Sequence, residues 1–233
     1  MKITIIHPSR SRPQMAFQTA NNWLSSADDK DNIQYIMSLD SDDPMLSKYS
    51  YLIPEYSYPR ISLAHGSNKS AIEAINKIAN YYVGRSPEKN MIVIVVSDDF
   101  SCELGWDTKL LASLGSKSDF IVKTQDGIQP TLITLPIMDK VYYQRFGYIY
   151  HPDYLHMHSD EEMTIVGHML GRVITLPISF PHNHYSIGGM RHDSINRKND
   201  STYSQGKSVI ERRALNNFGI EKPLIKRGDI KWK

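Results

Sequence analysis

Two adjacent carboxylates, Asp98 and Asp99, directly follow the apolar run 91–96. A short run of this kind, rich in β-branched residues, is typical of a strand that is buried on both faces. Carboxylates at the end of such a strand can bind a hard divalent cation, Mg²⁺ or Mn²⁺, that keeps coordination positions open for phosphate oxygens. The same pair can also begin a turn or cap a helix. From these residues alone, both interpretations stay open.

A second candidate for metal chemistry is the pair His182 and His184. Side chains two residues apart on an extended segment point the same way, so both rings can face a crevice or both can line a polar strand edge. The other histidines of this region have no ligand spacing, and we expect surface or hydrogen-bonded positions for His151, His156, His158 and His168. We expect Cys102, the only cysteine, to be structural.

The elements that must position these residues alternate between strands and helices. The sequence predicts strands at 2–6, 33–38, 91–96, 120–123, 131–135 and 173–178. It predicts helices from about Ser11, over 70–83, over 161–170 and over 209–218, with possible capping boxes at Ser11 with Gln14 and at Ser70 with Glu73. This order favours one α/β domain with a mostly parallel sheet flanked by helices. The loops after residues 6, 38 and 96 should then line one crevice at the carboxyl edge of the sheet.

The stretch VIVVSDDFSCELGWD resembles the metal-binding acidic motif of GT-A glycosyltransferases of the family 2 type, in which a Gly-Trp pair often follows the aspartates. The resemblance implies a single GT-A (Rossmann-like) domain over 1–190. Its nucleotide-sugar half would cover about 1–106 and its acceptor half about 107–190. Residues 191–233 would then form an extension of loops and a helix with a basic tail.

The donor site follows from the same resemblance. The segments ITIIHPSRSRP, YIMSLDSDDP and Asn68-Lys69-Ser70 resemble the family's opening strand with its Arg loop, its second strand and its nucleotide loop. The residues implied to contact the nucleotide sugar are His7, Ser9, Arg10, Arg12, Asp40, Asn68, Lys69, Ser97, Asp98 and Trp106.

The metal and the catalytic base are implied by two further segments. ISFPHNHYSIGG resembles the histidine motif that contacts the metal, which gives Asp98, Asp99, His184 and, as second choice, His182 as ligands. The motif reads Ser-Asp-Asp instead of Asp-x-Asp, so Asp98 can bind either the metal or the ribose. GYIYHPDYLHMHSDEEMTIVGHMLG resembles the segment whose acidic pair opens a helix beneath the acceptor, which gives Asp160 and then Glu161 as the base. An acidic helix start favoured by the macrodipole is the alternative for this pair.

These features predict a hexosyl- or pentosyltransferase that moves a sugar from a nucleotide diphosphate donor, UDP-linked by preference, to a hydroxyl with inversion, using Mn²⁺ or Mg²⁺. The acceptor can be a glycan, a lipid-linked sugar, a protein or a hydroxylated DNA base. A sugar-1-phosphate nucleotidyltransferase is the enzyme alternative, although residues 7–12 lack the glycine expected there. A noncatalytic nucleotide- or glycan-binding protein with the same fold is the other alternative.

Composition and charge set the remaining bounds. The chain has 233 residues with 40% hydrophobic and 22% charged residues, which is ordinary for one globular domain. Its formal net charge of +2 does not require a nucleic-acid partner, yet basic residues gather near the end at Arg212, Arg213, Lys222, Lys226, Arg227, Lys231 and Lys233. No run is long enough for a membrane helix and no signal peptide is visible. With a single cysteine, these features predict a cytoplasmic protein.

Overall fold

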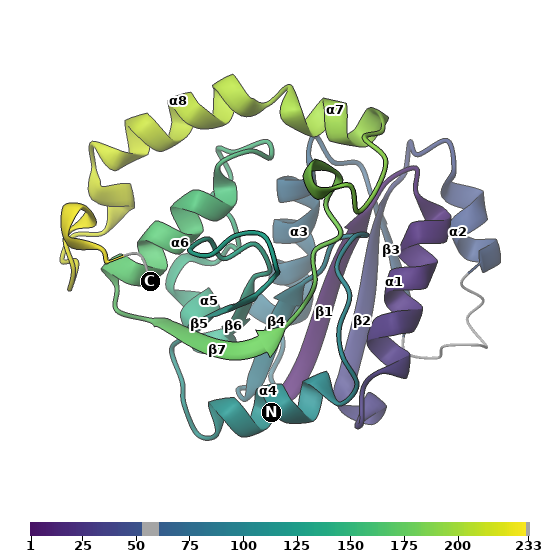
Figure 1. Cartoon of the computed structure of the whole chain (residues 1–233), viewed down its shortest axis with the longest axis horizontal. Helices are drawn as coiled ribbons and strands as arrows, with labels where there is room; N and C mark the ends of the chain where they lie inside the picture. Colours follow the sequence, from purple (N-terminus) through teal and green to yellow (C-terminus); the bar gives the residue numbers. More distant parts are fainter. Residues whose placement is uncertain (53–60, 232–233) are drawn as a thin grey trace.

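The computed structural model describes residues 1–52 and 61–231, and its centre is a seven-stranded sheet in the order β3-β2-β1-β4-β6-β5-β7 (Figure 1). The strands are β1 Lys2–Ser9, β2 Ile33–Asp40, β3 Ile61–Gly66, β4 Met91–Val95, β5 Ile121–Gln125, β6 Ile137–Asp139 and β7 Val173–Ser179. Pairing is parallel except at β6, which runs antiparallel to both β4 and β5. The predicted single α/β domain with a mostly parallel sheet is confirmed.

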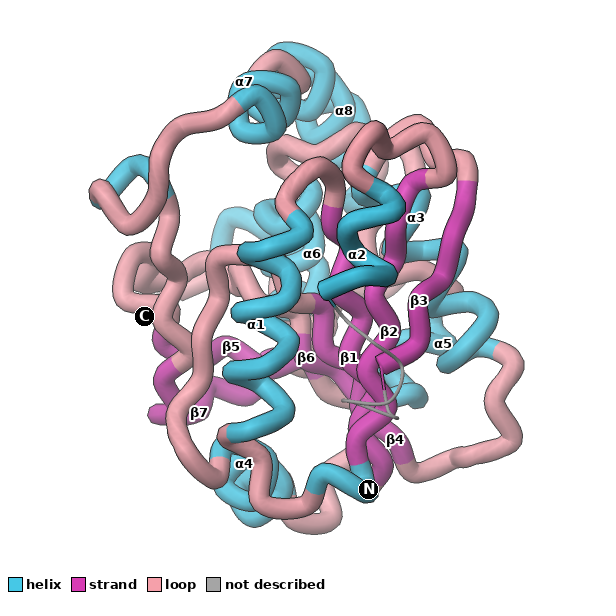
Figure 2. The backbone as a smooth tube through the Cα atoms, turned by 90° about the vertical axis from the view of Figure 1, so that its right-hand side faces the viewer, coloured by secondary structure: helices cyan, strands magenta, loops and turns pink. Residues whose placement is uncertain are grey.

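Helices cover both faces of the sheet. One core contains the apolar sides of α1 Pro13–Ser25, α2 Leu46–Leu52 and α4 Trp106–Leu114; Figure 2 shows α1 and α2 in front of the strands. The other core contains those of α3 Ala71–Ala79, α5 Lys140–Phe146 and α6 Ser159–Met169. This double cover explains why β4 is buried at every position.

Trp106 belongs to the first core. It is fully buried, and its ring lies 4.9 Å from that of Trp23, which in turn stacks on Phe180 at 5.1 Å. The indole Nε1 of Trp106 donates a hydrogen bond to the backbone oxygen of Trp23. The prediction that Trp106 contacts the nucleotide sugar is therefore wrong, because its whole surface packs inside the protein.

Most predicted elements are present, and two details differ. Residues 131–135 form no strand, since the Ile133 amide donates to the Thr164 hydroxyl instead of a neighbouring strand; β6 follows at Ile137–Asp139. The first helix begins at Pro13 without the expected capping box, because Ser11 has a positive φ of 58° and donates to the Asp43 carboxylate. The cap at Ser70 is confirmed, with the Glu73 amide as donor at 3.2 Å.

The C-terminal region differs most from expectation. Instead of one helix over 209–218, it contains α7 Ser194–Asp200 and α8 Tyr203–Ala214. We call residues 191–214 the C-terminal arm. Figure 1 shows the arm crossing the molecule above the carboxyl ends of β1 and β2 and above α6. Within residues 1–52 and 61–231, no helix is long and apolar enough to cross a membrane.

Candidate functional site

Three of the predicted donor residues meet at the carboxyl edge, where side-chain bonds join the ends of three parallel strands. Arg10 after β1 contacts Asp40 at the end of β2 at 2.9 Å, and Asn68 after β3 donates to the other oxygen of Asp40 at 2.9 Å. Arg10 also pairs with Asp42 at 2.6 Å, and this contact, opposed by burial, raises the pKa of the guanidinium. We call Arg10, Asp40 and Asn68 the donor corner.

One polar atom of the donor corner has no partner within the described part of the chain. Asn68 Oδ1 is buried and accepts no hydrogen bond, although the amide nitrogen is bonded to Asp40. Buried acceptors are normally paired, so an unpaired one at a predicted binding site is a position for a ligand donor group. Lys69 is exposed beside it, with its backbone amide bonded to Glu73.

His7 and Ser9 lie within β1 and not in the loop after it. His7 is fully buried between Tyr35, whose hydroxyl lies 2.7 Å from Nδ1, and Asp98, whose Oδ1 lies 3.0 Å from Nε2. The Ser9 hydroxyl is 3.0 Å from that of Tyr49 and is also buried. The prediction that His7 and Ser9 contact the donor is corrected: both sit inside the sheet, and His7 holds the Asp98 carboxylate.

Asp98 and Asp99, which follow β4, lie in different environments. The Asp98 side chain is 5% exposed, with Oδ1 at His7 and Oδ2 at 3.7 Å from Arg12. Asp99 accepts from the Ser97 hydroxyl at 2.6 Å and lies 3.2 Å from His182 Nε2. Burial raises the pKa of Asp99, but the contacts with His182 and Ser97 outweigh it and hold the pKa at about 2. Asp99 is therefore a charged, nearly buried carboxylate near neutral pH.

Residues after β7 bring the histidine pair to Asp99. The Asn183 amide donates to the Asp99 backbone oxygen at 2.8 Å, and the His182 ring stacks on Phe100 at 4.2 Å. The rings of His182 and His184 lie 5.0 Å apart. His182, the second choice of the sequence, is thus the histidine that pairs with Asp99, and His184 lies further out.

Asp99 and the histidine pair suit a divalent metal only if a bound diphosphate supplies part of the coordination shell. Among residues 1–52 and 61–231, no three His, Cys, Asp or Glu side chains form a cluster that could hold a metal ion. Carboxylate and imidazole groups from Asp99 and the histidine pair fit Mn²⁺ or Mg²⁺ when diphosphate oxygens complete the coordination. These residues fit such a shared metal, and they do not form a closed site.

The two acidic candidates for the base differ sharply. Burial raises the pKa of Asp160 above its usual range, against the opposing effect of the Glu161 amide, which donates to it at 2.9 Å. Glu161 has a side chain that is 43% exposed and bonded to His158 at 2.8 Å. Glu162, the next residue, is buried against Tyr154 and Arg213. Asp160 is thus the member of this pair whose pKa is raised by burial, and Glu161 is the exposed, ion-paired one.

His156 was not expected near the site. Burial lowers the pKa of this histidine, and the charges of Asp200, Asp99 and His184 act on it as well. Its Nδ1 is a buried atom without a hydrogen-bond partner in the described region. The loop before α6 therefore extends toward the Asp99 side of the edge. No spacing in the sequence indicates this, because the contact depends on how the loop is folded.

Arg12 is held by the C-terminal arm, which sequence reasoning missed. Its guanidinium makes a bidentate contact with Asp193 at 2.7 and 2.8 Å and donates to Asn196 at 2.9 Å. Burial disfavours the Arg12 charge, but Asp193, Asp98 and Asp99 outweigh it and raise the pKa. Arg12 and Asp193 are 181 positions apart, and no local motif indicates their contact.

A separate cavity of about 420 Å³ lies at the amino ends of the strands, lined by Met1, Lys89, Met91 and Lys117 among others. None of the predicted site residues lines it. Ligands of open α/β sheets bind at the carboxyl ends of the strands, so we assign the candidate site to the carboxyl edge and not to this cavity.

No protein-family model and no curated protein matches the chain. Solved structures do resemble it. A mannosyltransferase from Pyrobaculum calidifontis, in complex with GDP-Man and Mn²⁺, aligns with a TM-score of 0.61 and 11% identity over 92% of this chain and 75% of its own. S. aureus TarS in complex with UDP aligns with a TM-score of 0.57 and 12% identity over 77% of this chain and 59% of its own. GalNAc-T7 with UDP, GalNAc and Mn²⁺ aligns with a TM-score of 0.60 and 9% identity over 78% of this chain and 43% of its own. The chain has the GT-A fold of glycosyltransferases.

Proposed function

We propose that the chain is a metal-dependent glycosyltransferase that moves a sugar from a nucleotide diphosphate sugar to an acceptor hydroxyl. The observation that carries the proposal is the charged Asp99 paired with His182 after β4, at the same carboxyl edge of the sheet as the donor corner. This edge combines groups for a nucleotide with groups for a metal. The three structural neighbours hold nucleotide ligands, which supports the same class of donor.

The donor corner is the proposed site for the base and ribose. Asp40 is 18% exposed and can accept from a base N–H or a ribose hydroxyl, while Asn68 Oδ1 is an unused acceptor. Arg10, bonded to Asp40, fixes the direction of that carboxylate. TarS and GalNAc-T7 bind UDP, and we propose a UDP-linked donor here.

Asp99, with His182 or His184, is proposed to hold Mn²⁺ or Mg²⁺ together with the diphosphate. A divalent cation at this position would neutralise charge on the diphosphate. The departing group gains negative charge as the glycosidic bond breaks, so fixed positive charge lowers the barrier. Arg12, buried beside Asp98, is the protein's own cation near this position.

Asp160 is proposed as the general base of a single, inverting displacement. The acceptor oxygen attacks the anomeric carbon, the bond from that carbon to the diphosphate oxygen breaks, and the electron pair leaves with the nucleoside diphosphate. The proton of the acceptor hydroxyl passes to the Asp160 carboxylate. A raised pKa suits this role, because the ideal base titrates closer to the working pH than an ordinary aspartate does.

A panel of nucleotide sugars tests the proposal. The purified protein is incubated with each sugar and Mn²⁺, and release of nucleoside diphosphate is measured with and without a chelator. We expect chelator-sensitive release from one or a few donors, UDP-linked among them. Release of pyrophosphate from a nucleoside triphosphate and a sugar phosphate would favour a nucleotidyltransferase. Binding of UDP without any release or transfer would favour a noncatalytic protein.

A further inference from the structure

Charge in this chain is divided between the body and the C-terminal region. After Tyr185 the sequence contains eleven of the 27 basic residues and five of the 25 acidic ones. The preceding part therefore carries more acidic than basic side chains. The arm, residues 191–214, contains six of these basic residues and three of the acidic ones, so it also has a net positive charge.

Within the arm, two of the three acids, Asp193 and Asp200, are bonded and partly buried, and most bases face solvent. Asp193 binds Arg12, and Asp200 accepts from the Tyr185 hydroxyl at 2.9 Å. In contrast, Arg197, Lys198 and Lys207 are exposed and pair with no described carboxylate. Asp193 is thus paired with the body, while Glu211 is the one arm acid that is itself exposed, so Arg197, Lys198 and Lys207 leave the outward surface with a net positive charge.

This outward surface flanks both halves of the proposed site. The charge of Lys198 acts on Asp42, which itself binds Arg10 of the donor corner. The ring of Tyr203, at the start of α8, lies 4.7 Å from that of His158, two positions before Asp160. An acceptor that reaches Asp160 therefore passes beside a positively charged surface.

We propose that the acceptor is a nucleic acid that lies along the outward surface of the arm, an inference that rests on the proposed transferase function. Phosphates spaced along a chain complement the cations of α7 and α8. Tyr203 is 49% exposed among them and offers a ring on which a base can stack.

The composition of this surface distinguishes a nucleic acid from a lipid bilayer. Membrane-binding helices combine cations with several exposed apolar side chains. Between residues 191 and 214, Tyr203 is the one large apolar side chain that is exposed. Polar residues fill the other outward positions, among them Ser194, Ser201, Ser204 and Ser208. This favours contact with a hydrated phosphate backbone.

Binding of a fluorescein-labelled 20-nucleotide DNA strand, and of its duplex, tests the inference by anisotropy across a range of salt concentrations. We expect binding at 50 mM salt that weakens steeply as salt rises. The double variant K198Q/K207Q should weaken binding about tenfold or more. It should lower the slope of log K against log salt by about 1.8 for the duplex and about 1.4 for the single strand, because two cations are removed. The matched control K89Q/K117Q removes two exposed lysines at the amino ends of the strands and should leave binding unchanged.

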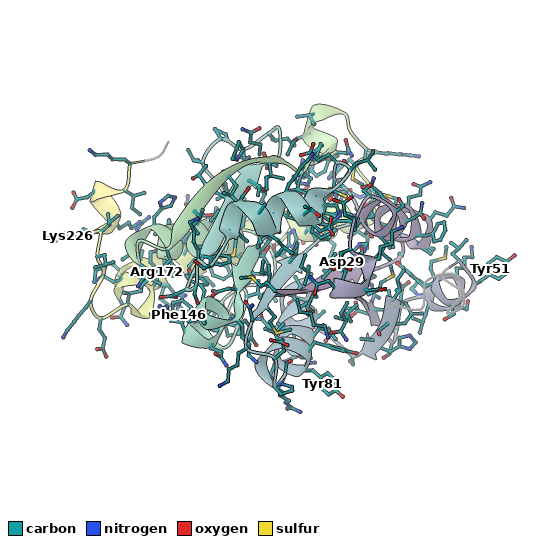
Figure 3. All side chains as sticks on the ribbon, turned by 90° about the horizontal axis from the view of Figure 1, so that it is seen from below. Asp29, Tyr51, Tyr81, Phe146, Arg172 and Lys226 are labelled. Atoms are coloured by element: carbon teal, nitrogen blue, oxygen red, sulfur yellow. The ribbon has the colours of Figure 1, made fainter. Side chains whose placement is uncertain are left out.

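Tyr203→Ala should weaken binding of the single strand more than binding of the duplex, because unpaired bases are free to stack. Tyr51→Ala is the control, since Tyr51 is 84% exposed and projects from the end of the molecule opposite Lys226 (Figure 3). Equal losses in the arm and control variants would overturn the inference, as would the absence of DNA binding at 50 mM salt. Arm-dependent binding to phosphatidylserine vesicles that exceeds binding to DNA would overturn it in favour of a membrane.

Thermal stabilisation by UDP with Mn²⁺ is measured on the same variants. K198Q/K207Q should keep that stabilisation, since neither lysine belongs to the donor corner. If UDP with Mn²⁺ fails to stabilise the wild type while DNA binding depends on the arm, the transferase function fails and the nucleic-acid surface stands. If UDP with Mn²⁺ stabilises the protein and DNA does not bind, the acceptor inference alone fails.

Discussion

The proposed donor and acceptor sides of the carboxyl edge are assembled in different ways. On the donor side, Arg10, Asp40 and Asn68 each follow a parallel strand, and the register of those strands brings them together. On the acceptor side, Asp160 and His156 depend on a loop that is held from outside by the arm. The Met157 amide donates to Thr202, and Gln205 donates to the Asp153 backbone oxygen. The donor side is thus set by the sheet, and the acceptor side by a late segment of the chain.

This difference indicates that donor binding and transfer can be separated by mutation. Changes at the ends of β2 and β4 should act on donor affinity. Changes in α6 and the arm should act on transfer or on the docking of the arm, with less effect on the donor.

The largest effect is expected from Asp160→Asn. The amide keeps the size of the side chain but cannot take the acceptor proton, so transfer should fall by about 10²- to 10⁴-fold. Donor affinity should change by less than about 1 kcal/mol, measured by calorimetry with UDP and Mn²⁺. Glu161→Gln is the control, because neighbours on a helix point about 100° apart. If Glu161→Gln is inactive and Asp160→Asn is active, the base is Glu161 and not Asp160.

Asp40→Ala tests the proposed donor side. Loss of a charged acceptor at the donor corner should weaken UDP binding by about 1.5 to 3 kcal/mol, or roughly 10- to 100-fold. Calorimetry with and without Mn²⁺ checks this, and the metal dependence should remain because Asp99 is intact. Unchanged UDP affinity would remove Asp40 from the donor site.

Gly206→Ala tests whether the arm holds the acceptor loop. A Cβ at this position would lie 2.1 Å from the Met157 backbone oxygen, so the helix and the loop cannot keep their present contact. We expect a loss of about 1 to 3 kcal/mol in the free energy of unfolding and faster proteolysis of the arm. Gly228→Ala is the control, since an added Cβ there meets nothing within 4 Å. Equal stability of the two variants would contradict close docking of α8.

A smaller effect is expected from Asp193→Asn in acid. The bonds from Arg12 lower the pKa of Asp193 to about 2, below its ordinary value of 3.8. A depressed pKa stabilises the fold above pH 4, and this contribution is lost as the pH falls toward 2. The melting temperature of Asp193→Asn should therefore be lower than that of the wild type at neutral pH, and the two should converge in acid. A constant difference at all pH values would show that the ion pair does not act through this proton.

The same division explains which features could be predicted from the sequence. Strands with continuous apolar runs, such as β4, and the polar loops after them are local patterns, and they singled out Asp98 and Asp99, while the family resemblance of the second-strand and nucleotide-loop segments singled out Asp40 and Asn68. The length of β1 could not be predicted from a local pattern. The strand continues to Ser9, so His7 and Ser9 are buried inside the sheet instead of lying in the loop after it. Trp106 follows a glycine in the expected motif, yet a tryptophan there can pack inward as easily as outward, and Trp23 with Phe180 provides its partners.

The sequence predicted only the last part of α8, at 209–214, and missed the rest of the arm for a different reason. Its helices are short and polar, so hydrophobic periodicity is weak, and the Arg12–Asp193 pair joins opposite ends of the chain. The predicted basic tail is also only partly free. Arg213 binds Glu162 at 2.8 Å, and Arg212 pairs with Asp153, so both stabilise the acceptor side.

The central claim is that Asp99 and the nucleotide diphosphate share a divalent metal, and thermal unfolding with UDP and Mn²⁺ tests it most directly. The account predicts that Mn²⁺ and UDP together raise the melting temperature of the wild type much more than UDP alone, because the metal joins the carboxylate to the phosphates. Asp99→Ala should lose the metal-dependent part and keep the rest. Equal stabilisation by UDP in the presence of excess chelator, or an Asp99→Ala variant that behaves like the wild type, would contradict the account.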